Sequence, residues 1–202
     1  MDPQFVCIGL GNPGDRYAGT RHNVGFSFID ALAGARGCSL RRRLFRPLEI
    51  AEDSLGRGLL ARLVLVKPLT FMNRSGSILP WLQRRTAASV DRICVVVDNM
   101  DLSPGEVRMK KRGGPSGHNG LRSVSEYLGT DEYSRIYFGI GRPRNGEDVV
   151  SHVLGQFLPE EDSAVTAAID RIVEFMNNDT PETLDQLISG VNARRTGRVG
   201  EL

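Results

Sequence analysis

The alternation of apolar segments constrains the fold of this chain more than any other feature. Short runs rich in Val, Ile, Leu and aromatic residues predict strands, and a weaker run predicts one more; together they cover residues 5–10, 47–52, 59–67, 92–98 and 134–140. Helical periodicity follows over residues 24–32, after Asn119, and over residues 159–176. Strands that alternate with helices predict an α/β fold with a mixed, mostly parallel β-sheet flanked by helices on both faces.

The length of 202 residues, of which 40% are hydrophobic, suits a single domain and is short for two. A last helix is expected from near Thr180, and the sequence after Gly190 has no apolar face to bury. We therefore expect a domain over residues 1–190 and a flexible tail over residues 191–202. No apolar run approaches the roughly 20 residues that cross a bilayer, and no signal peptide is recognisable, so we expect a cytoplasmic protein without membrane contact.

The charge total of 26 basic against 24 acidic residues says little about partners, but the distribution is uneven. Basic residues gather between Arg36 and Arg46, between Arg108 and Arg112, and in a sparser set from Arg135 to Arg144. Such groups can form a phosphate-binding face on a nearly neutral molecule. For the run from Arg41 to Arg43, the sequence leaves two interpretations open: an auxiliary RNA contact or a solvated surface.

The loop after the first strand matches the dinucleotide-binding pattern G-x-G-x-x-G through Gly9, Gly11 and Gly14. Its context argues against that interpretation. Pro13 removes a backbone amide that a pyrophosphate would use, the following residues do not continue as a helix, and the expected acidic residue after a second strand is missing. A nucleotide cofactor is therefore not expected.

The chain contains three histidines, His22, His118 and His152, so few side chains can transfer protons near neutral pH. Asp98 ends an apolar strand, where a partly buried carboxylate could align an imidazole that acts as a general base on water. Taken singly, His22 could equally be a surface or capping residue, and Asp98 could cap a turn. The chain has no G-x-S-x-G, no HExxH and no Cys/His metal spacing, which favours a metal-free hydrolase.

Six blocks in a fixed order give the chain a resemblance to a known family. They are GLGNPG followed by Tyr17 and TRHNVG, KPLTFMNRSG, VVVDNMDLSPGEVRMKK, GHNGLRS and FGIGRP. In this order they resemble bacterial peptidyl-tRNA hydrolase from about Phe5 to about Gly190. The resemblance implies a single-domain, monomeric α/β enzyme without a cofactor. It also implies the reaction, hydrolysis of the ester between peptide and tRNA in peptidyl-tRNA, which recycles tRNA released prematurely from ribosomes.

The resemblance also implies roles for individual residues. His22 is similar to the family's general base, and Asp98 to the carboxylate that orients it. Asn12 resembles the residue that distinguishes blocked peptidyl-tRNA from free aminoacyl-tRNA, although each loop asparagine could also be an ordinary turn residue. The remaining substrate contacts implied in this way are Tyr17, Phe71, Asn73 and Asn119 at the tRNA end and peptide, and Arg108, Lys110 and Arg135 at the tRNA phosphates.

The chain departs from the family pattern at several positions. The glycine-rich lid contains Arg112, Pro115 and Ser116, and Tyr137 stands where the family generally has a basic residue. Pro80 predicts a kink or a late start in the helix expected after Asn73. The lid changes leave an alternative open, a non-catalytic RNA-binding protein of the same fold that acts in RNA processing. The retained set around the base argues against that alternative.

Overall fold

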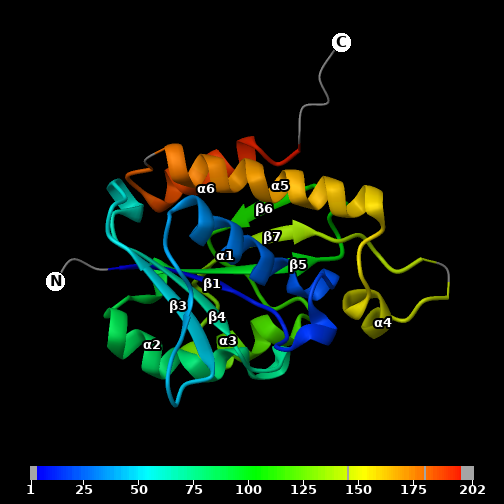
Figure 1. Ribbon diagram of the computed structural model, residues 1–202, viewed down its shortest axis with the longest axis horizontal. Coiled ribbons are helices and arrows are strands. Elements are labelled where there is room, and N and C mark those ends of the chain that lie inside the picture. The colour runs from blue at the N-terminus through cyan, green and yellow to red at the C-terminus, as the bar shows by residue number, and fades with distance from the viewer. Residues whose placement is uncertain (1–3, 145, 180, 197–202) are drawn as a thin grey trace, which may run out of the picture.

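The computed structural model describes residues 4–144, 146–179 and 181–196. Within them, seven strands form one sheet in the order β2-β3-β4-β1-β5-β7-β6, with helices on both of its faces (Figure 1). The central strands β4, β1, β5 and β7 are parallel, and β2, β3 and β6 pair antiparallel toward the edges. This arrangement confirms the predicted mixed sheet. The strand bounds are β1 Phe5–Gly9, β2 Arg41–Arg42, β3 Leu48–Asp53, β4 Leu63–Pro68, β5 Ile93–Asn99, β6 Val107–Lys110 and β7 Ser134–Gly139.

Two helical layers cover the sheet. Helices α1, α5 and α6 bury their apolar sides on one face, and α2 and α3 bury theirs on the other, while α4 stands to one side of both layers (Figure 1). None of the helices in the described residues could span a membrane. The helix bounds are α1 Val24–Ala35, α2 Leu79–Thr86, α3 Asn119–Leu128, α4 Val149–Leu154, α5 Pro159–Asn178 and α6 Leu184–Ala193, with short 3-10 segments η1 Asp15–Tyr17, η2 Arg21–Asn23, η3 Gly58–Leu60, η4 Met72–Ile78 and η5 Val90–Arg92.

The central strands are apolar throughout because both of their faces are covered. In β1, Phe5 and Cys7 pack with α1, α5 and α6, and the alternate residues Val6 and Ile8 pack with α2 and α3. All four are at most 1% exposed. Burial on both faces of the sheet therefore explains the continuous apolar run that predicted this strand.

The glycines after β1 bring the first helix close to the sheet. A Cβ on Gly9 would lie 2.2 Å from the carbonyl oxygen of Gly25, which is in the first turn of α1. Because only a glycine permits this approach, α1 begins directly against the carboxyl end of β1. The resemblance of this loop to a dinucleotide fingerprint thus has a packing origin.

Two strands escaped prediction, β2 and β6. In β6 buried Val107 and Met109 alternate with exposed Arg108 and Lys110, so an edge strand of four residues has too few apolar positions to stand out. The prediction at Pro80 resolves as a late start. Residues 72–78 form the 3-10 segment η4, and α2 begins only at Leu79, with the proline in its first turn, where a missing amide costs little.

The C-terminal part of the domain extends beyond the expected boundary at residue 190. Helix α6 continues to Ala193, and Val191 is fully buried in the layer that covers the sheet. The Asn192 side chain accepts a hydrogen bond from the Met109 amide at 2.9 Å and donates one to its carbonyl at 3.0 Å, which ties α6 to β6. The sequence after Gly190 suggested a flexible tail because Val191 is the one apolar residue there that packs against the domain in the described part of the chain. Residues 197–202 of the expected tail lie outside the described residues.

Candidate active site

His22 lies in the short segment η2, at the entrance to α1, and its imidazole contacts Asp98 near the carboxyl end of β5. Its neighbours fix the segment in place. The Arg21 amide donates to the Gly155 carbonyl at 2.9 Å, and the Asn23 carboxamide bonds the backbone of Asn12 twice, at 2.8 and 3.0 Å. The imidazole of His22 is therefore presented by a loop held at both ends.

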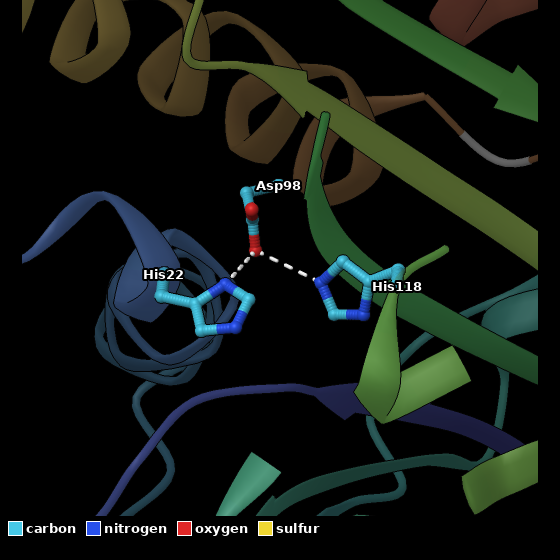
Figure 2. Close-up of side chains that lie close together, drawn as sticks. All are labelled: His22, Asp98 and His118. Atoms are coloured by element: carbon cyan, nitrogen blue, oxygen red, sulfur yellow. Dashed lines mark hydrogen bonds and ion pairs between the residues drawn. The ribbon is translucent and has the colours of Figure 1, made fainter. Parts of the chain in front are cut away.

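Two imidazoles form hydrogen bonds with the same oxygen atom of Asp98 (Figure 2). His22 Nδ1 lies 2.7 Å from Asp98 Oδ1, and His118 Nε2 lies 3.1 Å from the same Oδ1. Asp98 is 4% exposed and is the second-last residue of the buried strand β5, whereas His118 directly precedes α3. Three segments that are far apart in the sequence thus meet at one carboxylate.

The surrounding hydrogen bonds determine which ring nitrogens carry protons. His118 is the N-cap of α3, and its Nδ1 accepts from the amides of Gly120 at 3.1 Å and Leu121 at 3.3 Å. Since Nδ1 is an acceptor, the proton of a neutral His118 lies on Nε2 and is donated to Asp98. His22 likewise donates from Nδ1, which leaves its Nε2 unprotonated and directed away from the carboxylate (Figure 2).

Asp98 remains ionised in this environment. Burial by itself would raise the pKa of Asp98, but the charges of His22 and His118 and the hydrogen bonds that they donate outweigh it and hold that pKa well below its ordinary value of 3.8. A carboxylate therefore faces the two imidazoles near neutral pH. Such a group can stabilise an imidazolium that forms beside it.

A pocket of about 340 Å³ opens beside the carboxylate. Its floor contains His22, Asp98 and His118, and its lining includes Asn119 at the start of α3 and residues of the lid segment from Pro115 to Gly117. Helix α4 contributes an apolar wall of Val149, Val150 and Val153. A substrate in this pocket would lie against the imidazoles and be partly shielded from water.

Asn12 lines a neighbouring hollow of about 360 Å³ rather than this pocket. Its side chain is nearly buried, and its Oδ1 accepts a hydrogen bond from the Met72 amide at 2.8 Å. Because the oxygen is used, the group that Asn12 can still offer is the Nδ2 donor. The loop after β1 and the segment η4 are joined by this contact.

Three of the residues predicted to contact substrate come from the loop after β1 and from the start of η4. Tyr17 and Phe71 form an edge-to-face pair with ring centres 6.4 Å apart, and Phe71 is 56% exposed whereas Tyr17 is buried. Asn73 is exposed on η4, two residues after Phe71. The exposed Phe71 ring is a flat apolar surface open to a ligand.

The predicted phosphate contacts divide into two kinds. Arg108 and Lys110 are exposed on β6, and Lys110 Nζ lies 6.0 Å from the centre of the Tyr137 ring. Arg135 is 0% exposed: its guanidinium stacks on Tyr133 at 4.0 Å and donates to the Asp131 carbonyl. A phosphate cannot reach Arg135 in this structure, which corrects the expectation for that residue. Its side chain lies on the inward side of β7, an orientation that the sequence pattern did not reveal.

The same three side chains could hold a metal ion. Ligand atoms of His22, Asp98 and His118 all lie within 4.8 Å of one another, and they form the sole such group in the described part of the chain. A metal bound through the two imidazole nitrogens that face Asp98 would require both of them to give up their protons. The arrangement of donors around Asp98 therefore suits a proton relay at least as well as a cation.

Sequence reasoning named His118 among the three histidines without giving it a role in the site. The structure shows it bound to Asp98 and capping α3 at the same time. The pattern His118-Asn119-Gly120 before an apolar helical stripe was a signal for a helix start at this position, but it did not reveal the contact with Asp98.

Comparison with known proteins identifies a family over nearly the whole chain. The family model described as peptidyl-tRNA hydrolase matches residues 6–198. The peptidyl-tRNA hydrolase of Geobacillus thermodenitrificans is 39% identical over 187 residues, which is 93% of this chain and 98% of that protein. That of Halalkalibacterium halodurans is 42% identical over 172 residues, 84% of this chain and 89% of that protein. The crystal structure of peptidyl-tRNA hydrolase from Acinetobacter baumannii superposes with a TM-score of 0.81 at 33% identity and covers 93% of this chain and 94% of that one.

Proposed function

The chain belongs to the peptidyl-tRNA hydrolase family, and we propose that it cleaves the ester between peptide and tRNA with His22 as the general base for water. The observation that carries this proposal is the pair of N–H groups that converge on Asp98 Oδ1, because it leaves His22 Nε2 free to accept a proton. Cleavage returns the tRNA of prematurely released peptidyl-tRNA to translation in the cytoplasm.

In the proposed reaction, a water molecule in the pocket loses a proton to His22 Nε2 as its oxygen attacks the ester carbonyl. Asp98 does not take the proton. It keeps the imidazole oriented and stabilises the imidazolium that forms. The proton then passes to the departing 3′ oxygen of the ribose, so that a free carboxylic acid and a tRNA with a free hydroxyl result. No metal ion is needed in this sequence of steps.

Asn12 gives a physical basis for discriminating between substrates. Its Oδ1 is engaged by Met72, so Nδ2 would donate to the carbonyl of an N-acyl group. A free aminoacyl-tRNA would present an ammonium group, another donor, at the same place. We propose that Asn12 favours blocked substrates for this reason.

The remaining predicted contacts fit roles around this centre. Asn119, which lines the pocket, can donate to the oxygen on which negative charge develops. The exposed ring of Phe71, supported by Tyr17, can stack on the terminal base, and Asn73 beside it can bond the ribose or peptide. Arg108 and Lys110 can hold the tRNA phosphates. We expect the protein to act as a monomer.

The test is hydrolysis of an N-blocked aminoacyl-tRNA by the wild type and by His22→Ala. The variant should lose turnover by about 10³-fold or more, because it lacks the proposed proton acceptor, while keeping the melting temperature and the affinity for uncharged tRNA. Undiminished hydrolysis by the variant would reject His22 as the base. A wild-type protein that binds the N-blocked aminoacyl-tRNA without hydrolysing its ester would instead favour the RNA-processing alternative. The intact contact between His22 and Asp98 argues against that alternative.

A further inference from the structure

The hairpin between β2 and β3 carries a surface for which the proposed function has no use. Its turn exposes Leu44 and Phe45, which are 79% and 90% exposed. Exposed arginines surround them, and we call the whole set the hairpin patch: Arg41, Arg42, Arg43, Leu44, Phe45 and Arg46. In Figure 1 this hairpin extends beyond α2 at the lower edge of the view.

The charges of the hairpin patch are not neutralised. Within the described residues, no acidic side chain forms an ion pair with any of its four arginines, and Glu49, which pairs with Arg42 across the strands, instead contacts Lys67 at 3.4 Å. Arg43 and Arg46 lie 6.0 Å from the ring centre of Trp81 on α2, which holds the turn against that helix. Positive charge therefore gathers on a supported hairpin.

The other basic region is more heavily compensated. Lys111 pairs with Asp185 at 3.2 Å, and Arg112 pairs with Glu132 at 3.4 Å. Arg135 is buried, which leaves Arg108 and Lys110 as the exposed cations of β6. The hairpin patch thus offers more free cationic side chains than the surface on which sequence reasoning placed the phosphate contacts.

Phe45 occupies a backbone conformation that a solvated turn would not select. It is the third residue of a turn closed by the Arg46 amide and the Arg43 carbonyl at 3.3 Å, and its φ is 59°. Gly or Asn is favoured at such a position, because a Cβ is strained there. An aromatic ring that is both strained and exposed gains nothing from the fold, so its presence points to a ligand.

The hairpin lies at the catalytic end of the sheet. Leu48 pairs with Pro68 at the carboxyl end of β4, and the Leu69 amide donates to the Pro47 carbonyl at 2.7 Å. Two residues later the chain reaches Phe71, beside Tyr17. The hairpin patch and β6 lie on opposite edges of the sheet, six strand spacings or about 29 Å apart, with the catalytic pocket between them.

We propose that the hairpin patch is a second RNA-binding surface, in which the arginines bind backbone phosphates and Phe45 stacks on a base. Arginine matches phosphate oxygens with a planar fork of donors, and an aromatic ring among cations is the usual arrangement for sequence-independent RNA binding. An anionic membrane fits less well, because two apolar side chains bury little surface in lipid. The identity of the RNA as the tRNA of the substrate rests on the proposed function.

The test measures binding of uncharged tRNA over a range of salt concentrations. Arg41→Gln/Arg42→Gln should raise Kd by about fivefold or more and reduce the slope of log K against log salt by roughly 1.5, close to one phosphate contact per arginine. The control Arg57→Gln removes an exposed charge at the opposite end of the sheet and should change Kd less than about twofold. Unchanged affinity and slope in the double variant would overturn the proposal.

The second variant, Phe45→Asn, separates binding from folding. Asn tolerates the positive φ, so the melting temperature should stay the same or rise while tRNA affinity falls by about fivefold or more. Leu55→Asn, at an 89% exposed position at the other end of the sheet, is the control and should bind tRNA normally. Wild-type affinity in Phe45→Asn would overturn the stacking role.

Binding to vesicles that contain anionic lipid is measured as the last control. If the hairpin variants lose vesicle binding while tRNA binding is unchanged, the hairpin patch binds lipid and the proposal fails. Uncharged tRNA undergoes no hydrolysis, so these results do not depend on catalysis. A wild-type protein without turnover would reject the proposed function and leave the binding result standing.

Discussion

Replacement of Asp98 by Asn would remove one negative charge from the centre of the site while keeping the size of the side chain. With Nδ1 of His22 and Oδ1 of Asp98 at 2.7 Å, the centres of the imidazole and the carboxylate lie about 4 Å apart. At that separation, a pair of unit charges with an effective dielectric constant of about 20 interacts by about 4 kcal/mol. The imidazolium formed in the proposed reaction would lose this stabilisation.

An increase of about 4 kcal/mol in the barrier corresponds to a decrease of about 10³-fold in kcat. The ground state should change less, because a neutral His22 can still donate to the Asn oxygen, so KM should stay within about threefold. The assay is single-turnover release of tRNA from an N-blocked aminoacyl-tRNA at saturating enzyme, with the melting temperature measured for both proteins.

The matched control is Asp101→Asn. Asp101 also lines the pocket, but its side chain is 67% exposed and pairs with Arg142, so its charge acts through water. Its removal should lower kcat by no more than about fivefold, the size of a 1 kcal/mol interaction. If Asp98→Asn behaved like this control, the assignment of Asp98 as the stabiliser of His22 would be refuted.

Other variants test the supporting structure. His118→Ala should lower kcat by about ten- to a hundredfold, because Asp98 loses a hydrogen-bond donor to a charged group; His118→Asn should recover the stability of the helix cap but not the activity, and recovery of both would show that the cap alone matters. Glu161→Gln should destabilise the protein by about 1–2 kcal/mol near pH 7. Burial raises the pKa of Glu161, but a backbone amide and two arginines lower it by more, so the net pKa lies below the ordinary value of 4.5. The stability difference between wild type and variant is therefore fully present above pH 4.5 and should shrink in thermal melts as the pH falls below that value. A stability difference that did not change with pH would contradict the pairing. Gly9→Ala should destabilise by about 3 kcal/mol or more, whereas Gly34→Ala, which meets open space on α1, should be neutral or stabilise by up to about 1 kcal/mol in denaturant titrations; equal effects would contradict the close approach of α1 to β1.

Local patterns in the sequence were sufficient where one segment determines its own structure. The apolar runs located the central strands, since a strand buried on two faces must be apolar at every position. Pro159 and the acidic residues after it located the start of α5, because they complete a helix N-terminus by local bonds. The position of Asp98 at the end of an apolar run and the scarcity of histidines pointed to a His–Asp pair, and the structure brings His22 and Asp98 into contact.

Contacts between segments that are distant in the sequence could not be predicted from such patterns. The sequence contains Arg135 as one more basic residue, and only the packing of β7 shows that it is buried against Tyr133. The role of His118 depends on an N-cap that turns its second nitrogen toward a strand 20 residues earlier in the chain. Similarly, the boundary near residue 190 was misplaced because Asn192 bonds to an edge strand that was itself too short to predict.

The sequence by itself determined the kinds of element, their order, and the residue types available for the chemistry, because propensity, capping and burial act over a few neighbouring residues. The tertiary structure alone decided which side chains share one oxygen of Asp98, which arginines remain free, and that the basic hairpin lies at the catalytic end of the sheet. These properties arise from strand order and register, which bring together residues that are dozens of positions apart.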